Sequence, residues 1–291
     1  MADDRDSDSA CCPPPVAASD DILQDRHRNS VRDAYSRVAQ ADNAGEACGI
    51  GSSCCGVGDD AMINTIVSTR LGYSEADLEL VPGGADMGLG CGNPKAIAAL
   101  QPGEVVVDLG SGGGLDCFLA AAEVGDEGRV IGVDMTPDML SKARANALKG
   151  RFSNVEFRLG EIEHLPVADD SADVIISNCV INLSPNKPQV FRDALRVLKP
   201  GGRMAVSDIV ATVELPDEMR DAPELVAGCM GNASLIEDLE SMMAAAGFEQ
   251  IRIEPKDESK AFIKEWAPDH SVTDYLVSAS ITALKPRSGC C

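Results

Sequence analysis

The sequence predicts an α/β fold, in which a mostly parallel sheet is covered by helices on both faces. From Glu104 onward, short apolar runs alternate with helical patterns, as in strands joined by crossover helices. The apolar runs are nearly continuous and rich in β-branched residues, which is typical of strands buried on both faces. A glycine-rich turn separates the first apolar run from the first helical pattern.

The elements follow from these patterns in order. Before the sheet, an apolar stripe predicts a helix over residues 22–39. Parallel strands are expected at 104–109, 129–134, 155–160, 173–178 and 203–210, with helices between them at 115–124, 138–148 and 188–198. Later patterns predict helices near 216–230 and 234–246 and strands near 248–255 and 275–284. This last pair of strands would add an antiparallel edge to the sheet.

Charge excludes two classes of partner. The chain has 25 Lys and Arg against 47 Asp and Glu, a formal net charge of −22, which repels phosphate backbones and anionic lipid surfaces. We therefore expect no nucleic acid and no membrane as partners. The sequence has no apolar run of about 18 residues, and its first thirty residues are acidic where a signal peptide would be basic and then apolar. These features predict a cytoplasmic protein.

The glycine-rich turn has a pattern suited to a nucleoside ligand. Asp108 and Leu109 lead into Gly110-Ser111-Gly112-Gly113-Gly114, and a second acid, Asp134, ends the next predicted strand. Glycine allows a tight turn and close approach of a ligand to the backbone, and an acid at the end of the second strand can accept hydrogen bonds from ribose hydroxyls. The turn lacks the Lys of a P-loop and the spacing of a dinucleotide fingerprint.

Two segments, DLGSGGG from Asp108 and GVDMT around Asp134, resemble the first two motifs of class I S-adenosylmethionine-dependent methyltransferases. The resemblance implies a Rossmann-like, mostly parallel seven-stranded sheet and S-adenosylmethionine as cofactor. It also implies a set of cofactor-binding residues, comprising Asp108, Gly110, Ser111, Gly112, Gly114, Asp134, Met135, Thr136, Glu161, Ile162 and Asn178. In that family the segment containing Glu161 and Ile162 faces the adenine.

The chain also contains eleven cysteines, an unusually large number. In a cytoplasm thiols stay reduced, so ligand or redox roles are favoured over disulfide staples, and the absence of any Cys-x-x-Cys spacing argues against a zinc finger. Three isolated cysteines lie where α/β folds place ligands: Cys91 before the first strand, Cys179 after the fourth, and Cys229 in the later helical segment. Glycines flank Cys91 and Cys229, from which we expect both sulfur atoms to be accessible.

The segment Ser177-Asn178-Cys179-Val180-Ile181-Asn182-Leu183, with the segments around Cys91 and Cys229, resembles arsenite methyltransferases over roughly residues 30–285. The resemblance implies methyl transfer from S-adenosylmethionine to trivalent arsenic bound by these three cysteines, a detoxification reaction. Soft trivalent arsenic prefers thiolates, and its lone pair needs no general base. The domain expectation is a tail at 1–20, a helix and Cys-rich loop at 21–69, a cofactor-binding core at 70–211, an arsenic-site and sheet-completing region at 212–286, and a tail at 287–291.

A redox step is implied as well, because methyl transfer oxidises arsenic and a second round needs two electrons. The family uses a further cysteine near its amino terminus, and Cys48, Cys54 and Cys55 are the candidates, with Cys54 and Cys55 preferred. A thiol reductant, thioredoxin or glutathione, would reopen the disulfide. Two alternatives stay open: a methyltransferase acting on a quinone or another small organic acceptor, and a non-catalytic arsenic-binding or sensing protein.

Overall fold

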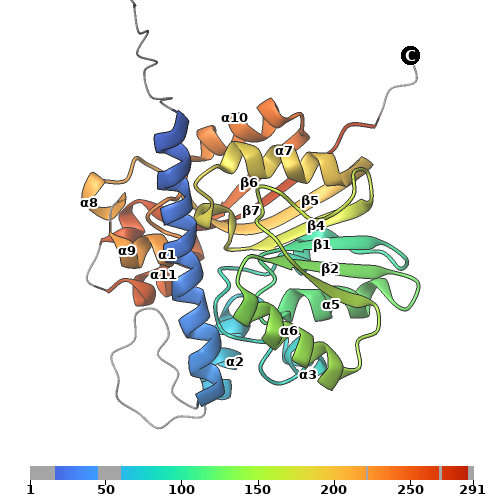
Figure 1. Cartoon of the computed structure of the whole chain (residues 1–291). Helices are drawn as coiled ribbons and strands as arrows, with labels where there is room; N and C mark the ends of the chain where they lie inside the picture. The colour runs from blue at the N-terminus through green and yellow to red at the C-terminus, as the bar shows by residue number, and fades with distance from the viewer. Residues whose placement is uncertain (1–16, 45–59, 221, 269–270, 288–291) are drawn as a thin grey trace, which may run out of the picture.

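The computed structural model describes residues 17–44, 60–220, 222–268 and 271–287, and these residues form a sheet with helices on both faces (Figure 1). The sheet has seven strands in the order β3-β2-β1-β4-β5-β7-β6. The strands are β1 (Val105–Leu109), β2 (Arg129–Asp134), β3 (Val155–Leu159), β4 (Ala172–Asn178), β5 (Leu198–Ala211), β6 (Glu249–Lys256) and β7 (Leu276–Leu284). Strands β1 to β5 pair in parallel, whereas β7 is antiparallel to both β5 and β6, so the expected antiparallel edge is confirmed.

Eleven α-helices are described. They are α1 (Ala17–Ala44), α2 (Asp60–Arg70), α3 (Glu75–Leu80), α4 (Lys95–Ala98), α5 (Leu115–Val124), α6 (Pro137–Gly150), α7 (Lys187–Val197), α8 (Asp217–Arg220), α9 (Pro223–Ala227), α10 (Ile236–Ala246) and α11 (Lys260–Trp266). Short 3₁₀ turns lie at Ile181–Leu183, Asp257–Ser259 and Val272–Asp274. Within the described ranges, no helix has the length and apolar character needed to cross a membrane.

Two apolar cores lie on opposite faces of the sheet because successive side chains of a strand point to opposite sides. In β1, Val107 and Leu109 pack with Phe191 of α7 and Met243 of α10, while Val106 packs with α5 and α6 on the other face. Figure 1 shows α7 and α10 on one side of the sheet and α5 and α6 on the other. The predicted α/β class is therefore confirmed.

Helices α2, α3, α4 and α11 were not predicted, and two of the predicted helices differ clearly from expectation. Helix α1 begins at Ala17, inside the segment 1–20 that we expected to be a tail, and its remaining residues 1–16 lie outside the described part. The predicted helix at 216–230 is wrong, because the chain forms the short helices α8 and α9 there. Proline disfavours helical backbone at the residue before it, and Ala222, which precedes Pro223, has the extended backbone angles φ −72° and ψ 113°.

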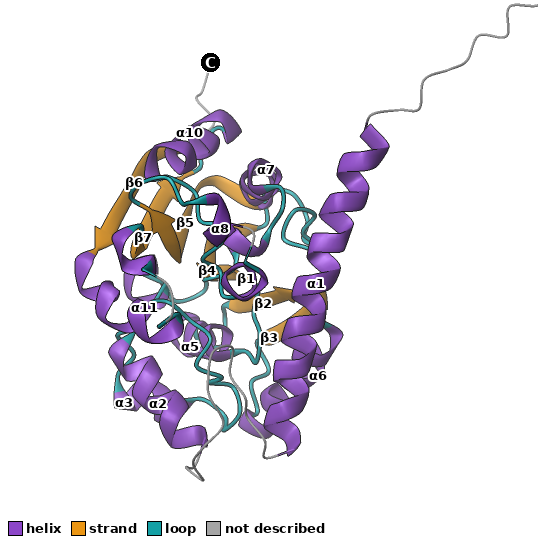
Figure 2. Ribbon diagram, turned by 90° about the vertical axis from the view of Figure 1, so that its left-hand side faces the viewer, coloured by secondary structure: helices purple, strands orange, loops and turns teal. Residues whose placement is uncertain are grey.

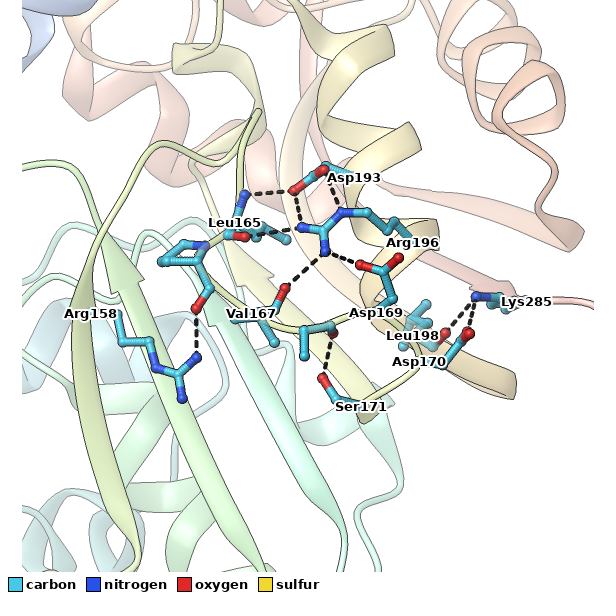
Figure 3. A network of polar contacts seen from close by, with 12 residues as sticks. Arg158, Leu165, Val167, Asp169, Asp170, Ser171, Asp193, Arg196, Leu198 and Lys285 are labelled. Atoms are coloured by element: carbon cyan, nitrogen blue, oxygen red, sulfur yellow. Dashed lines mark hydrogen bonds and ion pairs between the residues drawn. The ribbon is translucent and has the colours of Figure 1, made fainter.

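A polar network fixes the loop between β3 and β4 against α7 (Figure 3). The Arg196 guanidinium donates hydrogen bonds to the carbonyl oxygens of Leu165 and Val167 and to both carboxylate oxygens of Asp193. Asp193 in turn accepts the backbone N–H of Leu165 at 2.6 Å. Because the same loop carries Glu161 and Ile162, this network positions two of the predicted cofactor-binding residues.

Candidate functional site: a cavity beside a cluster of thiols

A cavity opens at the point where the strand order reverses, between β1 and β4. In parallel α/β sheets this position, outside the carboxyl ends of the strands, is where ligands bind. Most of the predicted cofactor-binding residues line the cavity, namely Asp108, Gly110, Ser111, Gly112, Asp134, Met135, Thr136, Ile162 and Asn178. Gly114 and Glu161 do not line it: Gly114 caps α5, and the carboxylate of Glu161 pairs with Arg28 and Arg32.

The glycine-rich turn is held by hydrogen bonds to the end of β2. The backbone N–H groups of Gly110 and Ser111 donate to the carbonyl oxygen of Val133 at 2.8 and 3.0 Å. Gly113 lies so close to the neighbouring chain that a Cβ there would be 2.8 Å from the carbonyl oxygen of Ala85. At Gly112, by contrast, a Cβ would meet no atom within 4 Å, so the turn leaves open space at this point of the cavity.

Asp134 connects the turn to the next segment. Its carboxylate accepts the backbone N–H of Gly112 at 3.0 Å and that of Thr136 at 2.8 Å. Burial raises the pKa of Asp134, and the two N–H donors oppose that effect. The carboxylate is thus oriented by the backbone and keeps lone pairs for further donors, as a ribose-binding acid requires.

Two more buried acids line the cavity beside Asp134. Burial raises the pKa of Asp108, and it raises that of Asp116 to about 6. Asp116 is held by the hydroxyl of Tyr73 at 2.7 Å and by Nδ2 of Asn178 at 3.1 Å. Buried carboxylates are stabilised by a positively charged neighbour, so this wall of the cavity favours a ligand with positive charge.

Helix α1 contributes the outer wall of the cavity. Figures 1 and 2 show it as one long helix that runs past α6, and its residues Arg28, Val31 and Tyr35 line the cavity. Arg28 forms ion pairs with Glu161 and Glu163, each at 3.4 Å. These contacts join α1 to the loop after β3.

The three cysteines singled out in the sequence lie together, and one of them, Cys179, lines the cavity. Cys91, Cys179 and Cys229 pack in one buried cluster, and the sulfur atoms of Cys91 and Cys179 lie within 4.8 Å of each other. Cys229 Sγ also donates to the backbone oxygen of Cys179 at 2.6 Å, and Cys91 Sγ donates to the backbone oxygen of Ser207 at 3.4 Å. We call these three residues the thiol cluster. Cys179 is its central member and also lines the cavity.

The expectation of accessible sulfur atoms at Cys91 and Cys229 is wrong, since these residues are only 1% and 2% exposed. The glycines on either side of Cys91 instead allow its loop to pack closely against neighbouring side chains. A Cβ at Gly90 would lie 2.7 Å from Nδ2 of Asn178, and one at Gly92 would lie 2.8 Å from the side chain of Ser207. Glycine therefore brings the Cys91 backbone against β4 and β5.

Burial and a neighbouring carboxylate keep the cluster protonated. Burial raises the pKa of Cys91 to about 11. At Cys179, the contact with Cys229 lowers the pKa, but the contact with Cys91 and burial outweigh it and raise the pKa. At Cys229, the contact with Cys179 and burial raise the pKa. The charge of Asp208 adds to this effect at all three. A carboxylate oxygen of Asp208 and the sulfur atoms of Cys91 and Cys179 all lie within 4.8 Å of one another.

The other cysteines separate into two groups. Cys117 is fully buried in α5, and its thiol donates to Oδ2 of Asp108 at 3.1 Å. Cys54 and Cys55, which we predicted to be redox residues, lie outside the described residues, as does Cys48.

Sequence reasoning missed Arg28, Tyr73 and Asp116. Arg28 shares an i, i+3, i+7 stripe with Val31 and Tyr35, and this stripe was the available signal for a helix face turned to the cavity. Asp116 stands among apolar neighbours in Leu115-Asp116-Cys117-Phe118, a setting in which an acid is buried and needs partners.

Comparisons with known proteins show which family the chain resembles. Residues 100–247 match the methyltransferase-domain family. The chain is 54% identical over 262 residues to an arsenite methyltransferase of Halobacterium salinarum, covering 89% of this chain and 66% of the relative. It is 46% identical over 171 residues to an arsenite methyltransferase of Aquipseudomonas alcaligenes, covering 56% of this chain and 49% of that one.

A solved structure is also similar. It is the arsenic(III) S-adenosylmethionine methyltransferase of Chlamydomonas reinhardtii, with 33% identity, a TM-score of 0.59, and coverage of 77% of this chain and 74% of that chain. The present chain spans about two thirds of the length of the Halobacterium relative and about half of the Aquipseudomonas relative.

Proposed function

The chain belongs to the arsenite S-adenosylmethionine methyltransferase family, and from this membership together with the thiol cluster we propose that it methylates trivalent arsenic. The products are methylated arsenicals. The proposal rests on one observation: Cys91, Cys179 and Cys229 come from three distant segments and pack together beside the cavity that Cys179 lines. A methyltransferase of a quinone or another organic acceptor would have no use for three convergent thiols.

Arsenite suits a cluster of protonated thiols. Arsenous acid and three thiols condense to a tris-thiolate and three waters, so each thiol proton leaves with an arsenic hydroxyl and no net charge is buried. This balance fits a site in which burial opposes free thiolates. Three sulfur ligands leave the arsenic lone pair as the nucleophile, and the contribution of the protein is proximity and orientation.

The cavity fits S-adenosylmethionine. When bound, this cofactor supplies an electrophilic methyl group on a positively charged sulfur. Asp134 offers lone pairs for the ribose, and Asp108 and Asp116 offer negative charge. The hydroxyl of Ser111 is buried and, among the described residues, has no hydrogen-bond partner, so it is available to a ligand. Cys179 belongs to both the cavity wall and the thiol cluster, so arsenic bound by the cluster lies beside the cavity.

Repeated methylation needs two electrons for each return of arsenic to the trivalent state. We assign this step to a thiol pair that closes to a disulfide, formed by Cys91 and a cysteine of the 48–55 segment, and reopened by thioredoxin or glutathione. Such a cycle fits a cytoplasm, where thiols are kept reduced. Serine substitutions of Cys54 and Cys55, one at a time, test this assignment: unchanged second-round methylation in both variants would leave Cys48 as the partner.

The main test is direct. Purified protein is incubated with arsenite, S-adenosylmethionine and a thiol reductant, and the arsenic species are separated by chromatography with elemental detection. We expect methylated arsenic from the wild type and from Cys117→Ser, and little from Cys179→Ser. Absence of methylated arsenic, or equal yields from the wild type and Cys179→Ser, would overturn the proposal. Arsenite binding without any methylation would favour a sensing protein.

A further inference from the structure

The side chain of Asn178 connects the cavity to the thiol cluster. Its Oδ1 accepts the backbone N–H of Cys91 at 3.0 Å. Its Nδ2 is within hydrogen-bonding distance of three acceptors: Tyr73 Oη at 2.9 Å, the backbone oxygen of Gly92 at 3.0 Å and Asp116 Oδ2 at 3.1 Å. One amide group therefore contacts the loop that carries Cys91 and two side chains of the cavity wall.

This connection requires an amide. A carboxamide both donates and accepts, whereas a carboxylate accepts only and a hydroxyl is too short to reach both sides. The absence of a side chain at Gly90 makes room for it, because a Cβ there would be 2.7 Å from Nδ2. Asn178 is also the last residue of β4 and directly precedes Cys179, so its amide fixes the Cys91 backbone relative to the central cysteine.

On the cavity side, hydrogen bonds run from Asn178 through Tyr73 to the carboxylate of Asp116. The Tyr73 hydroxyl accepts from Asn178 and donates to Asp116 Oδ1 at 2.7 Å. Hydrogen bonds to an ionised carboxylate are roughly twice as strong as neutral ones, and bonds in a chain strengthen one another. Burial raises the pKa of Asp116 to about 6, and a cationic ligand in the cavity favours its charged form.

We propose that Tyr73, Asp116 and Asn178 make the binding of cofactor and of arsenite cooperative. When the cofactor occupies the cavity, the hydrogen bonds of these three side chains become stronger, and the Asn178 amide then holds the Cys91 backbone more firmly. The inference rests on the proposed function, because it takes the two ligands from it. In this arrangement Asn178 and Tyr73 are positioning residues: they act on the thiol cluster through the backbone of Cys91. By linkage, each ligand changes the affinity for the other by the same factor.

The test measures binding, without turnover. The dissociation constant of sodium arsenite is measured by equilibrium dialysis with and without saturating sinefungin, an unreactive cofactor analogue that carries an amine in place of the sulfonium. A phosphine reductant is used because thiol reductants compete for arsenite. We expect sinefungin to tighten arsenite binding of the wild type by about fivefold or more, the lower end of typical coupling between sites.

Tyr73→Phe removes only the hydroxyl, and we expect the sinefungin effect to fall below about twofold in this variant. Tyr275→Phe is the matched control, since no side-chain hydrogen bond of Tyr275 is described and it does not line the cavity; it should keep the wild-type ratio. Should Tyr73→Phe fold poorly by thermal melting, Asp116→Asn, which keeps the side-chain shape, takes its place. The ratio is informative because a merely structural defect weakens arsenite binding equally with and without the analogue.

Two results would overturn the inference while leaving the proposed function intact. One is that sinefungin does not change the dissociation constant of arsenite in the wild type. The other is that sinefungin tightens arsenite binding in Tyr73→Phe and Asp116→Asn by the same factor as in the wild type. Failure of the proposed function looks different. In that case the wild type neither retains arsenite in dialysis nor produces methylated arsenic.

Discussion

The thiol of Cys229 donates a hydrogen bond to the backbone oxygen of Cys179, with 2.6 Å between sulfur and oxygen. Both residues have left-handed backbone angles, φ 63° at Cys229 and φ 59° at Cys179, a conformation that side chains other than glycine seldom adopt. The surrounding packing must therefore impose these conformations, and strain of this kind clusters at functional sites. The packing thus holds both cysteines in the conformation that brings Cys229 Sγ to the Cys179 backbone oxygen.

This relationship predicts the outcome of Cys229→Ser. A serine hydroxyl can still donate to the Cys179 oxygen, so we expect the variant to fold, while arsenite loses a soft ligand. The dissociation constant of arsenite, measured by dialysis, should rise by at least about 10- to 100-fold, which is the loss typical of removing an outer-shell partner of a metal ligand. Cys117→Ser is the control, because this buried thiol bonds to Asp108 and should leave arsenite binding unchanged. Equal affinity in Cys229→Ser and the control would contradict a three-thiol site.

A second prediction concerns Asp208, whose carboxylate accepts the N–H groups of Ile181 and Ile209 at 2.9 and 2.8 Å. Its negative charge raises the pKa of each thiol in the cluster. We therefore expect Asp208→Asn to lower these pKa values and to speed alkylation of the cluster by iodoacetamide at neutral pH, because the thiolate is the reactive form. Residue-resolved mass spectrometry measures the rates.

The control for Asp208→Asn is Asp134→Asn, which removes another buried acid that is not among the main charges acting on the cluster. It should leave the alkylation rates of Cys91, Cys179 and Cys229 close to those of the wild type. Slower alkylation in Asp208→Asn than in the wild type would show that its charge does not govern these thiols.

The third prediction is a loss of stability at alkaline pH. The pKa of Cys91 is about 11 in the folded protein against an ordinary 9.0, so between these values the folded state holds a proton that the unfolded state has released. The free energy of unfolding then falls as the pH rises from about 9 to about 11, by at most about 3 kcal/mol from this group. Urea denaturation of the wild type and Cys91→Ser across this range measures the difference, and the variant should show the shallower decline. Parallel curves for the two proteins would refute the assignment.

The sheet and the grouping of the cysteines were predictable because they depend on local signals. Nearly continuous β-branched runs mark buried parallel strands, and residues that follow such strands converge at one edge of the sheet. Cys179 was placed by this rule, and the glycine-rich turn by its run of glycines between the first strand and the following helix. The late antiparallel pair followed from the order of helices and strands after β5.

The features that escaped prediction depend on contacts between distant segments. Cys91 is buried because its loop packs against β4 and β5, and Cys229 is buried in the apolar cluster that also contains Cys91 and Cys179. Flanking glycines alone suggested that both sulfur atoms were open to solvent. The bond between Tyr73 and Asp116 likewise joins residues from two separate segments, and neither shows a motif. The position of α1 over the cavity depends on pairs with a loop more than a hundred residues away, which an apolar stripe does not reveal.

That position of α1 gives the fourth prediction. Arg28 is 14% exposed and pairs with Glu161 and with Glu163, whose side chain is 4% exposed. Arg28→Gln removes the charge, leaves Glu163 with the Ser184 hydroxyl at 2.7 Å, and should loosen α1 from the loop after β3. Removing a partly buried ion pair of this kind costs about 1 kcal/mol of free energy, which corresponds to about a fivefold change in a binding constant. We therefore expect the dissociation constant of sinefungin, measured by titration calorimetry, to rise about fivefold in this variant.

Hydrogen exchange distinguishes a loosened helix from a local loss of charge. Amides in residues 20–40 should exchange faster in Arg28→Gln than in the wild type, because the helix opens more often when its cross-contacts weaken. Arg37→Gln is the matched control on the same helix: its described bond is to the Asp33 backbone within α1, so it should change neither exchange nor sinefungin affinity. If both variants behave alike, the ion pairs of Arg28 do not hold α1 over the cavity, and apolar contacts of Val31 and Tyr35 carry that role.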